Sequence, residues 1–459
     1  MSEMWRLSAR EAVRALSRGK IGAVELLEDI ESRCDAVNES INALPTLCFE
    51  RARNHARRLE NMPASDRGML CGLPVTIKDL TDVAGVRTTY GSAIFRDHVP
   101  AASDRLVRRI ESRGGIVYAK SNTPEFGTGG ITFNDVFGLT RSPRNTSRAS
   151  GGSSGGAAAS LAAGCAWLSH GSDMAGSLRT PAAFCGVTSL RPSPGRIRSD
   201  APLLPFDPLG QDGPMARSIG DLALFATAMF DEPSAELAAF DGKAAKPERI
   251  AVSNDLGITR IDERIEAALD RLCGTLSRAG CRITGAHPPL DGVHEAFDTL
   301  RAHAYAIAHE STLAEHPGIM KPENEWNIRS GMNLDPDRLR RAQRKQGGIV
   351  DAAERFMQDY DILICPATSL PSLPAHTRYP GFESGTPIPE YYRWLAIAYA
   401  TTATALPIVT LPVSYGEDGI PIAVQLVGNP RTEARLLRHA LWVEHHLGWD
   451  ASPTDPSGD

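Results

Sequence analysis

The stretch that decides the fold runs from Gly151 to Pro192 and reads GGSSGGAAASLAAGCAWLSHGSDMAGSLRTPAAFCGVTSLRP. It opens with six Gly and Ser residues, continues with a run of small apolar residues, and has a second Gly/Ser cluster around Ser177. A flexible linker would not be followed directly by such an apolar run. Glycine adopts backbone conformations that other residues avoid and lets backbones approach closely. We therefore interpret the stretch as a buried site built from loops and backbone amides.

The composition is that of an ordinary globular protein. The 459 residues are 42% hydrophobic and 23% charged, and the formal net charge is −6 with both signs interspersed. Because there is no basic block and no basic stripe interleaved with aromatic residues, nucleic acid is not expected as a partner. The eight cysteines lack C-x-x-C spacing and are expected to be buried free thiols. With no signal peptide recognised and no apolar run long enough to span a membrane, we expect a cytoplasmic protein.

Helical and strand patterns alternate along the chain. Helices are expected within 8–60, at 104–113, 157–163, 219–229, 263–279 and 432–446, and over most of 297–360. Strands are expected at 72–78, 115–119, 165–169, 250–252, 282–283, 361–365, 408–413 and 422–427, while 211–217 is expected only to lead into the next helix. This alternation predicts an α/β fold with a central mixed, twisted sheet covered by helices on both faces.

We expect one domain over the whole of 1–459, because no convincing linker interrupts the pattern. Within this domain we expect an N-terminal helical segment (1–62), a catalytic core that contains the signature (63–230), a variable substrate-lining region (231–400) and a C-terminal part of the core with strands and a helix (401–459).

Several familiar kinds of site are not supported. No zinc-binding His/Cys spacing, P-loop or dinucleotide-binding glycine pattern is present, so neither a metal nor a cofactor is expected. Gly151 to Gly155 satisfies G-x-S-x-G, the nucleophile elbow of α/β-hydrolases. That elbow needs a preceding central strand, and the polar residues 145–150 would make a poor one. We therefore disfavour the elbow interpretation.

Two serines and a lysine remain as candidates for the chemistry. A serine hydroxyl is a weak nucleophile until a base removes its proton. Lys78, at the end of an apolar strand, could be that base, because burial disfavours its charged form. Ser153 could relay the proton from Ser177, and backbone N–H groups of residues 174–177 could stabilise an oxyanion.

These motifs together resemble the amidase signature family. The similarity covers the Gly/Ser loop at 151–156, the segment 172–186, the P-V-x-I-K-D context of Lys78 and the segment 419–428. It implies a triad in which Ser177 is the acylated nucleophile, Ser153 is the relay with a cis peptide bond before it, and Lys78 is the ultimate base. The resemblance also implies an oxyanion hole formed by Met174, Ala175, Gly176 and Ser177. It implies supporting roles for Ser154, Asp173 and Arg179. It implies substrate contacts from Thr128, Gly129, Gly130 and Ile131.

Two departures from the family pattern affect these expectations. Ala175 replaces the usual glycine, which would be unfavourable if that residue needed a positive φ. Activity should survive, because an N–H remains there. Thr402 to Leu406 replaces a glycine-containing run, so this part of the substrate pocket cannot be transferred by analogy.

The function expected from this resemblance is hydrolysis of small or aryl amides, with carbamates and esters as further substrates, by a monomer or homodimer. Candidate pocket residues are mainly apolar and aromatic: Leu203, Leu204, Phe206, Tyr391, Tyr392, Trp394 and Tyr399. One alternative is the glutaminase subunit of a tRNA-dependent amidotransferase, disfavoured because no glutamine-carboxylate clamp is recognisable. Another is a non-catalytic interaction protein, which the three candidate residues disfavour.

Overall fold

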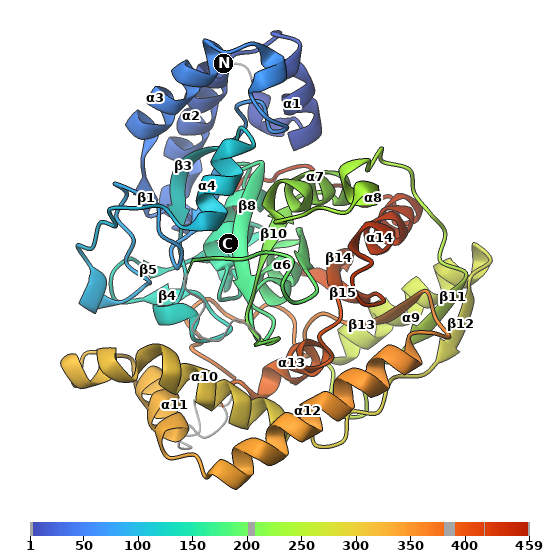
Figure 1. Cartoon of the computed structure of the whole chain (residues 1–459). Helices are drawn as coiled ribbons and strands as arrows, with labels where there is room; N and C mark the ends of the chain where they lie inside the picture. The colour runs from blue at the N-terminus through green and yellow to red at the C-terminus, as the bar shows by residue number, and fades with distance from the viewer. Residues whose placement is uncertain (1–2, 201–206, 381–390, 417, 458–459) are drawn as a thin grey trace.

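An 11-stranded sheet forms the centre of the computed structural model, which describes residues 3–200, 207–380, 391–416 and 418–457 (Figure 1). From edge to edge its strands are β1 (Thr46–Leu47), β3 (Ile116–Ser121), β2 (Pro74–Lys78), β8 (Leu168–Asp173), β10 (Gln211–Ala216), β9 (Thr188–Arg191), β14 (Ile408–Tyr415), β15 (Pro421–Val427), β13 (Ile362–Pro366), β11 (Arg249–Val252) and β12 (Arg282–Gly285). β2 pairs in parallel with β3 and β8, and β11 pairs in parallel with β12 and β13. The other neighbours are antiparallel, so the predicted mixed sheet is confirmed.

The α-helices surround this sheet. They are α1 (Ala9–Ser17), α2 (Ala23–Ile41), α3 (Phe49–Glu60), α4 (Arg105–Ser112), α5 (Gly155–Ala162), α6 (Arg179–Cys185), α7 (Ile219–Met229), α8 (Ala235–Ala238), α9 (Glu263–Arg278), α10 (Val293–Glu315), α11 (Pro322–Met332), α12 (Pro336–Phe356), α13 (Ala396–Ala403) and α14 (Glu433–Leu447). Two short hairpins pair β4 (Phe133–Asn134) with β5 (Gly138–Leu139) and β6 (Arg141–Ser142) with β7 (Asn145–Ala149). In the described ranges, none of the helices combines the length and the apolar character that a membrane span requires.

Strand β15 shows how the two faces of the sheet are covered. Gln425 accepts a hydrogen bond from Arg179 of α6. Its neighbours Val424 and Leu426 instead belong to the apolar cluster that contains Leu437 of α14. Because successive side chains of a strand point to opposite faces, α6 and α14 lie on opposite sides of the sheet.

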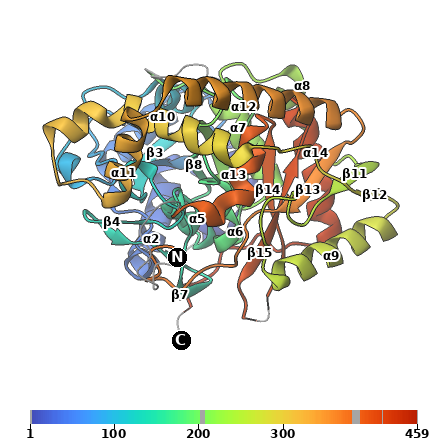
Figure 2. The same cartoon turned by 90° about the horizontal axis from the view of Figure 1, so that it is seen from below.

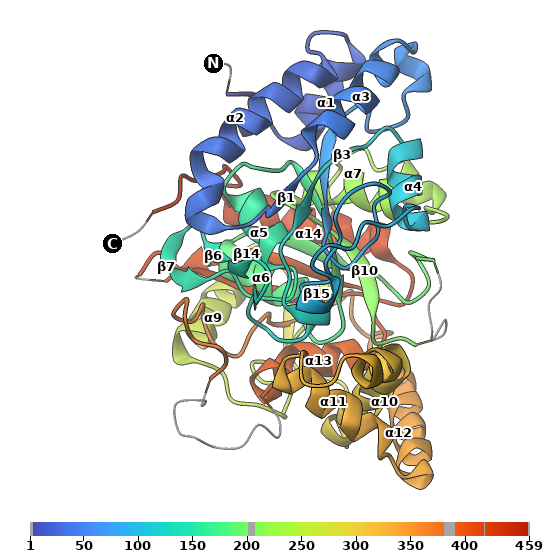
Figure 3. The ribbon, with the colours of Figure 1, turned by 90° about the vertical axis from the view of Figure 1, so that its left-hand side faces the viewer.

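Helices α10, α11 and α12 form a separate layer at the end of the molecule opposite α1, α2 and α3 (Figures 1 and 3). Figure 2 views the molecule from the side of this layer, where α10 and α12 run alongside α13. The predicted helical character of 297–360 is confirmed. The layer also supplies one wall of the cavity described below.

Helix α5 lies in the centre of the molecule, and each of its eight residues is buried. Its small side chains permit this placement. A Cβ atom on Gly156 would lie 2.2 Å from the Asn122 backbone nitrogen and 2.5 Å from the Ala43 carbonyl oxygen. Contacts this short exclude any larger residue, so the glycine is required by the close approach of neighbouring backbone.

Two strands differ from the sequence-based expectation. Residues 211–216 form a central strand, β10, although Pro214 lies in its middle and proline cannot donate a ladder hydrogen bond. The strand expected at 165–169 lies instead at Leu168–Asp173, so the signature residues Ser172 and Asp173 end a strand. Strand β7, which precedes the Gly/Ser loop, lies outside the central sheet, where it pairs with β6 and its Arg148 forms an isolated bridge with Pro374. Its polar sequence indicated that it would not be a central strand.

Each of the four segments expected from the sequence contributes strands to the one central sheet. The roles assigned to these segments stay a prediction. All eight cysteines are free thiols, as expected, and six of them are buried.

Candidate active site

Lys78 is the last residue of β2, and its side chain is fully buried. Its Nζ donates to three serine hydroxyls, at 2.7 Å to Ser153 Oγ, 2.9 Å to Ser154 Oγ and 3.0 Å to Ser172 Oγ. The first two belong to the Gly/Ser loop and the third to the end of β8. The lysine therefore connects three segments that are far apart in the sequence.

The environment of Lys78 favours its neutral form. Burial lowers the pKa of Lys78 from 10.5 to about 7. The carboxylates of Asp212 and Asp173 act in the opposite direction and offset part of this shift. Near neutral pH a large fraction of Lys78 is therefore unprotonated and able to accept a proton.

The Gly/Ser loop presents Ser153 beside this lysine. The peptide bond between Gly152 and Ser153 is cis. A Cβ atom on Gly152 would lie 2.8 Å from the Ile131 backbone nitrogen, so the loop packs closely on the neighbouring chain. Helix α5 begins directly after the loop, at Gly155.

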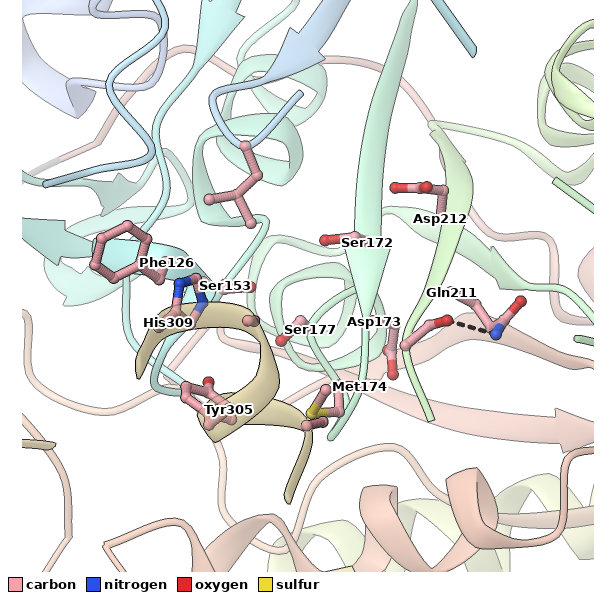
Figure 4. Close-up of a pocket in the computed structure, with 15 residues that line it drawn as sticks. Phe126, Ser153, Ser172, Asp173, Met174, Ser177, Gln211, Asp212, Tyr305 and His309 are labelled. Carbon is pink, nitrogen blue, oxygen red and sulfur yellow. Dashed lines mark hydrogen bonds between the residues drawn. The ribbon is translucent and has the colours of Figure 1, made fainter. Parts of the chain in front are cut away.

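Ser177 lies in the turn between β8 and α6, and its carbonyl oxygen accepts a hydrogen bond of 3.0 Å from the Ser154 N–H. This bond connects the two Gly/Ser clusters. Ser153 and Ser177 both line a cavity of about 240 Å³ (Figure 4). No direct hydrogen bond joins their hydroxyls in the described structure, although both face the same space.

A buried ion-pair network holds the turn that carries Ser177. Arg179 donates to both oxygens of the Asp173 carboxylate, at 2.7 and 3.0 Å, and Arg191 lies 3.5 Å from Oδ1. Burial by itself would raise the pKa of Asp173. The two arginines and the Leu178 N–H outweigh this effect and hold the pKa well below its usual range. The charged carboxylate is therefore the stable form.

Arg179 also connects the turn to the C-terminal segment. It donates to Thr401 Oγ1 at 2.6 Å, to Thr402 Oγ1 at 2.6 Å and to Gln425 Oε1 at 2.7 Å. Thr402, the first residue of the segment that departs from the family's usual pattern, thus binds the signature arginine together with Thr401.

The backbone amides expected to form an oxyanion hole are not equivalent. The N–H of Gly176 donates to Asp173 Oδ1 at 3.0 Å, so this expected donor is already engaged. Gly176 also carries the positive φ of the turn, +109°, whereas Ala175 has none. The methyl group of Ala175 therefore meets no backbone strain. The N–H groups of Met174, Ala175 and Ser177 remain as candidates.

The expected substrate-contact segment is only partly placed at a cavity. Gly129 lines a small cavity beside Ser177. The hydroxyl of Thr128 is hydrogen-bonded to Tyr305 at 2.8 Å, Gly130 packs against Trp394, and Ile131 lies in an apolar cluster. These last three residues have structural contacts rather than positions on a cavity wall.

The expected aromatic pocket is divided in a similar way. Tyr391 and Tyr392 line the small cavity beside Ser177. Tyr399 is fully buried and stacks on Phe297, and Trp394 packs beside Phe184. The expected residues Leu203, Leu204 and Phe206 lie outside the described residues.

Sequence reasoning missed several residues at the cavity. Tyr305 and His309 line it from α10, and Phe126 lies beside His309, with 4.5 Å between the ring centres (Figure 4). Burial lowers the pKa of His309 to about 4, so its imidazole is neutral at ordinary pH. Nothing in the helical periodicity of α10 distinguishes these side chains from ordinary packing residues.

Sequence reasoning also missed His170 and Asp212, of which His170 contacts the backbone of Lys78. The Lys78 backbone N–H donates to His170 Nδ1 at 3.4 Å, and His170 Nε2 lies 3.0 Å from Asp212 Oδ1. Because Nδ1 accepts, Nε2 carries the proton and donates to Asp212. Asp212 is also exposed to the cavity. Within the described ranges, no group of three or more His, Cys, Asp or Glu side chains is arranged to hold a metal ion.

The chain is similar to known proteins over almost its whole length. Residues 25–437 match the amidase family. The chain is 30% identical to an acylamidase of Rhodococcus erythropolis, with 98% of this chain and 97% of the relative covered. It is 29% identical to one component of the glutamyl-tRNA(Gln) amidotransferase of Anaeromyxobacter dehalogenans, with 99% of both chains covered. A solved structure described as a crystal structure of amidase superposes with a TM-score of 0.86 at 30% identity, covering 96% of this chain and all of the other.

The match to the family extends over most of the chain, and the relatives are covered almost from end to end. The chain therefore belongs to the amidase signature family of hydrolases, which cleave amide C–N bonds.

Proposed function

We propose that this protein hydrolyses small or aryl amides through an acyl-enzyme formed on Ser177. The observation that carries the proposal is the buried Lys78, whose pKa is lowered to about 7 and whose Nζ contacts Ser153 at the cavity that also contains Ser177. A neutral amine in contact with a hydroxyl can accept its proton, as nucleophilic catalysis by serine requires.

In the proposed mechanism, Lys78 accepts the Ser153 proton while Ser153 accepts the proton of Ser177. The Ser177 Oγ then attacks the amide carbonyl. The N–H groups of Met174, Ala175 and Ser177 are the proposed donors to the resulting oxyanion. The proton passes back through Ser153 to the leaving amine, and the C–N bond breaks. Water then attacks the acyl-enzyme by the same proton route and regenerates Ser177.

The cavity supports a small and largely apolar substrate. Apolar side chains that line it include Leu80, Phe126, Met174 and Ala308. Its volume of about 240 Å³ lies below the ~300–1,000 Å³ of sites for drug-sized ligands. The similarity to an acylamidase supports an amide as the substrate. Carbamates and esters present the same attackable carbonyl and are proposed as secondary substrates.

A second candidate function is the glutaminase subunit of a tRNA-dependent amidotransferase. The near-complete alignment to a component of a glutamyl-tRNA(Gln) amidotransferase favours it. The apolar side chains in the cavity wall, Leu80, Phe126, Met174 and Ala308, suit an apolar substrate group better than a polar glutamine side chain. Aryl-amide hydrolysis by the purified chain alone would favour the first function. Glutamine hydrolysis that appears only after a partner is added would favour the second.

Labelling with a fluorophosphonate probe, followed by intact-mass measurement, tests the nucleophile. The wild type should gain one adduct, and Ser177→Ala should gain none. Ser160→Ala is the control, because this buried serine lies within α5, away from the cavity, and should leave the labelling intact. Unchanged labelling of Ser177→Ala would refute the assignment.

A further inference from the structure

Arg301 is a buried cation close to the proposed nucleophile. It lies on α10, and only 4% of its surface is exposed. Together with Ser177 it lines a small cavity of about 30 Å³, separate from the larger one. None of the proposed steps of amide hydrolysis uses this arginine, so its placement needs another explanation.

Among the described residues, the groups that contact Arg301 are neutral. Its guanidinium donates to Asn327 Oδ1 and to the Tyr391 hydroxyl. Its Cζ lies 4.3 Å from the ring centre of Tyr392 and 4.6 Å from that of Tyr305. In the described part of the chain, no carboxylate lies within ion-pair distance of it. The buried arginines Arg179 and Arg191, by contrast, both contact the Asp173 carboxylate.

A buried charge without a counter-ion is unfavourable, because it has lost its hydration and gained no opposite charge in return. Aromatic rings and neutral acceptors compensate for only part of that loss. A carboxylate entering the cavity would supply the missing charge, and the planar guanidinium is suited to bind it with two parallel hydrogen bonds.

The size of the cavity restricts what could bind. A water molecule needs roughly 10–15 Å³ of such space. About 30 Å³ therefore accommodates a group of two or three heavy atoms, such as a carboxylate, but not an aromatic ring. Gly127, Met174, Tyr305 and Ser177 line both this cavity and the larger one. One ligand could thus occupy both while its amide lies at Ser177.

We propose that Arg301 binds a carboxylate on the substrate, so that the preferred substrates are short amides with an anionic group on one arm and an apolar group on the other. This inference rests on the proposed amide hydrolysis at Ser177. The larger cavity receives the apolar arm, and the carboxylate forms an ion pair with Arg301.

Matched substrates test the proposal. One series consists of anilides of short dicarboxylic acids with one free carboxylate, each compared with the neutral compound in which a carboxamide replaces that carboxylate. A second series places the carboxylate on the aromatic amine. Release of the aromatic amine gives kcat/KM for every compound. In at least one series, the wild type should prefer the anionic member by roughly 10- to 100-fold, as expected for a charge-assisted hydrogen bond.

Substitution of the arginine should abolish this preference. Arg301→Met should bring the anionic-to-neutral ratio of kcat/KM close to one, and Arg301→Lys should reduce it several-fold, because lysine keeps the charge but loses the planar fork. Arg329→Met is the control, since this exposed arginine of α11 pairs with Glu325 outside both cavities and should keep the wild-type ratio. An equal loss on both members of a pair in Arg301→Met would indicate a purely structural role and overturn the proposal.

A measurement on the wild type alone covers the case in which the variants fail to fold. The free dicarboxylic acids and their neutral diamides are compared as agents that slow fluorophosphonate labelling of Ser177. The acids should act at roughly 10-fold or more lower concentration than the diamides. Equal protection by the two would contradict the role of Arg301.

The two proposals fail in different ways. If Ser177 is not labelled and no amine is released from any compound, the proposed amide hydrolysis itself is wrong. If Ser177 is labelled and amides are hydrolysed, but no series shows a preference for the carboxylate, only the role of Arg301 is wrong.

Discussion

At the scale of single residues, the site contains two buried ionisable side chains, of which Lys78 readily loses its charge and Asp173 keeps it. Lys78 has lost its hydration without a carboxylate in direct contact, so its proton is weakly held. Asp173 is equally buried, but two arginines and two backbone N–H groups keep it ionised. The first residue is thereby able to exchange a proton, and the second gives the nucleophile turn a fixed geometry.

The proton affinity of Lys78 should appear in the pH dependence of activity. Since the neutral amine is the active form, kcat/KM on a substrate that does not titrate should rise about tenfold per pH unit up to pH about 7 and then level off. Lys78→Ala should lower kcat/KM by about 10²–10⁴.

A matched substitution tests the origin of this pKa. Asp212 raises the pKa of Lys78, so Asp212→Asn should move the midpoint of the profile to lower pH. A profile that stays flat between pH 6 and 9 in the wild type would contradict the role of Lys78 as base.

Removal of the Asp173 charge should destabilise the protein. Asp173→Asn leaves Arg179 and Arg191 buried beside a neutral amide, and breaking a buried ion pair typically costs about 3–5 kcal/mol. Denaturant unfolding should show this loss at neutral pH. Because the pKa of Asp173 is held below its ordinary value of 3.8, the difference between variant and wild type should shrink as the pH falls below about 4.

The control for this substitution is Asp351→Asn, which removes an exposed pair with Arg355 on α12. Exposed pairs contribute about 0–1 kcal/mol. Similar losses for the two variants would show that the buried network does not stabilise the turn.

At the scale of elements, the site is assembled at the ends of two neighbouring strands. Lys78 ends β2, and Asp173 ends β8, which pairs with β2 in parallel. Because parallel strands end at the same edge of a sheet, the proposed base and the turn with the proposed nucleophile are brought together there. Helix α5 directly follows the Gly/Ser loop, and its central position is possible because all of its residues except Leu161 are small.

Enlarging a residue of α5 should therefore be costly. In Gly156→Ala the new methyl group would collide with the backbone of Asn122 and Ala43, which cannot move as a side chain can. We expect a loss of about 1–3 kcal/mol or more in the free energy of unfolding, together with reduced activity.

Gly347→Ala on α12 provides a control that should raise, and not lower, the free energy of unfolding. This glycine is exposed and has open space around it, so alanine should stabilise the helix by up to about 1 kcal/mol. If Gly156→Ala were equally well tolerated in thermal unfolding, the close packing of α5 would not be needed for the fold.

At the scale of the whole molecule, the cavity lies between the edge of the sheet where β8 ends and helix α10 of the layer formed by α10, α11 and α12 (Figure 4). Glu125, which precedes the cavity residues Phe126 and Gly127, connects the two parts. Its carboxylate accepts hydrogen bonds from Ser92 Oγ, from the Lys321 N–H and from Asn324 Nδ2, each at 2.7 Å. The last two belong to the beginning of α11.

Glu125→Gln should weaken this connection. The side-chain NH2 group of glutamine cannot accept a hydrogen bond, and it would face one of the three donors that bind Glu125. At least one hydrogen bond is therefore lost, which costs about 1–3 kcal/mol of stability. We expect a higher KM and faster amide hydrogen exchange over residues 320–332. Glu325→Gln changes an exposed glutamate of the same helix and should alter neither quantity. An unchanged exchange rate in Glu125→Gln would show that other contacts hold the layer.

How much the sequence reveals differs between the parts of the molecule. The helices and strands are predictable where apolar residues form an almost continuous buried run, as in α7, β14 and β15. Strand β10 is missed, because Pro214 cannot donate to a sheet. In the same way, Tyr305, His309 and Arg301 on α10 carry no local signal, since their function depends on what faces the helix.

The sequence by itself determined the family and the α/β class, and it predicted the three candidate catalytic residues Lys78, Ser153 and Ser177. It could do so because small residues and a strand-end lysine leave a recognisable pattern in Gly151 to Pro192 and around Lys78. The tertiary structure alone decided the charge state of Lys78, the engagement of the Gly176 amide and the cavity wall from α10. Each of these depends on burial and on contacts between segments distant in the chain, which no local pattern encodes.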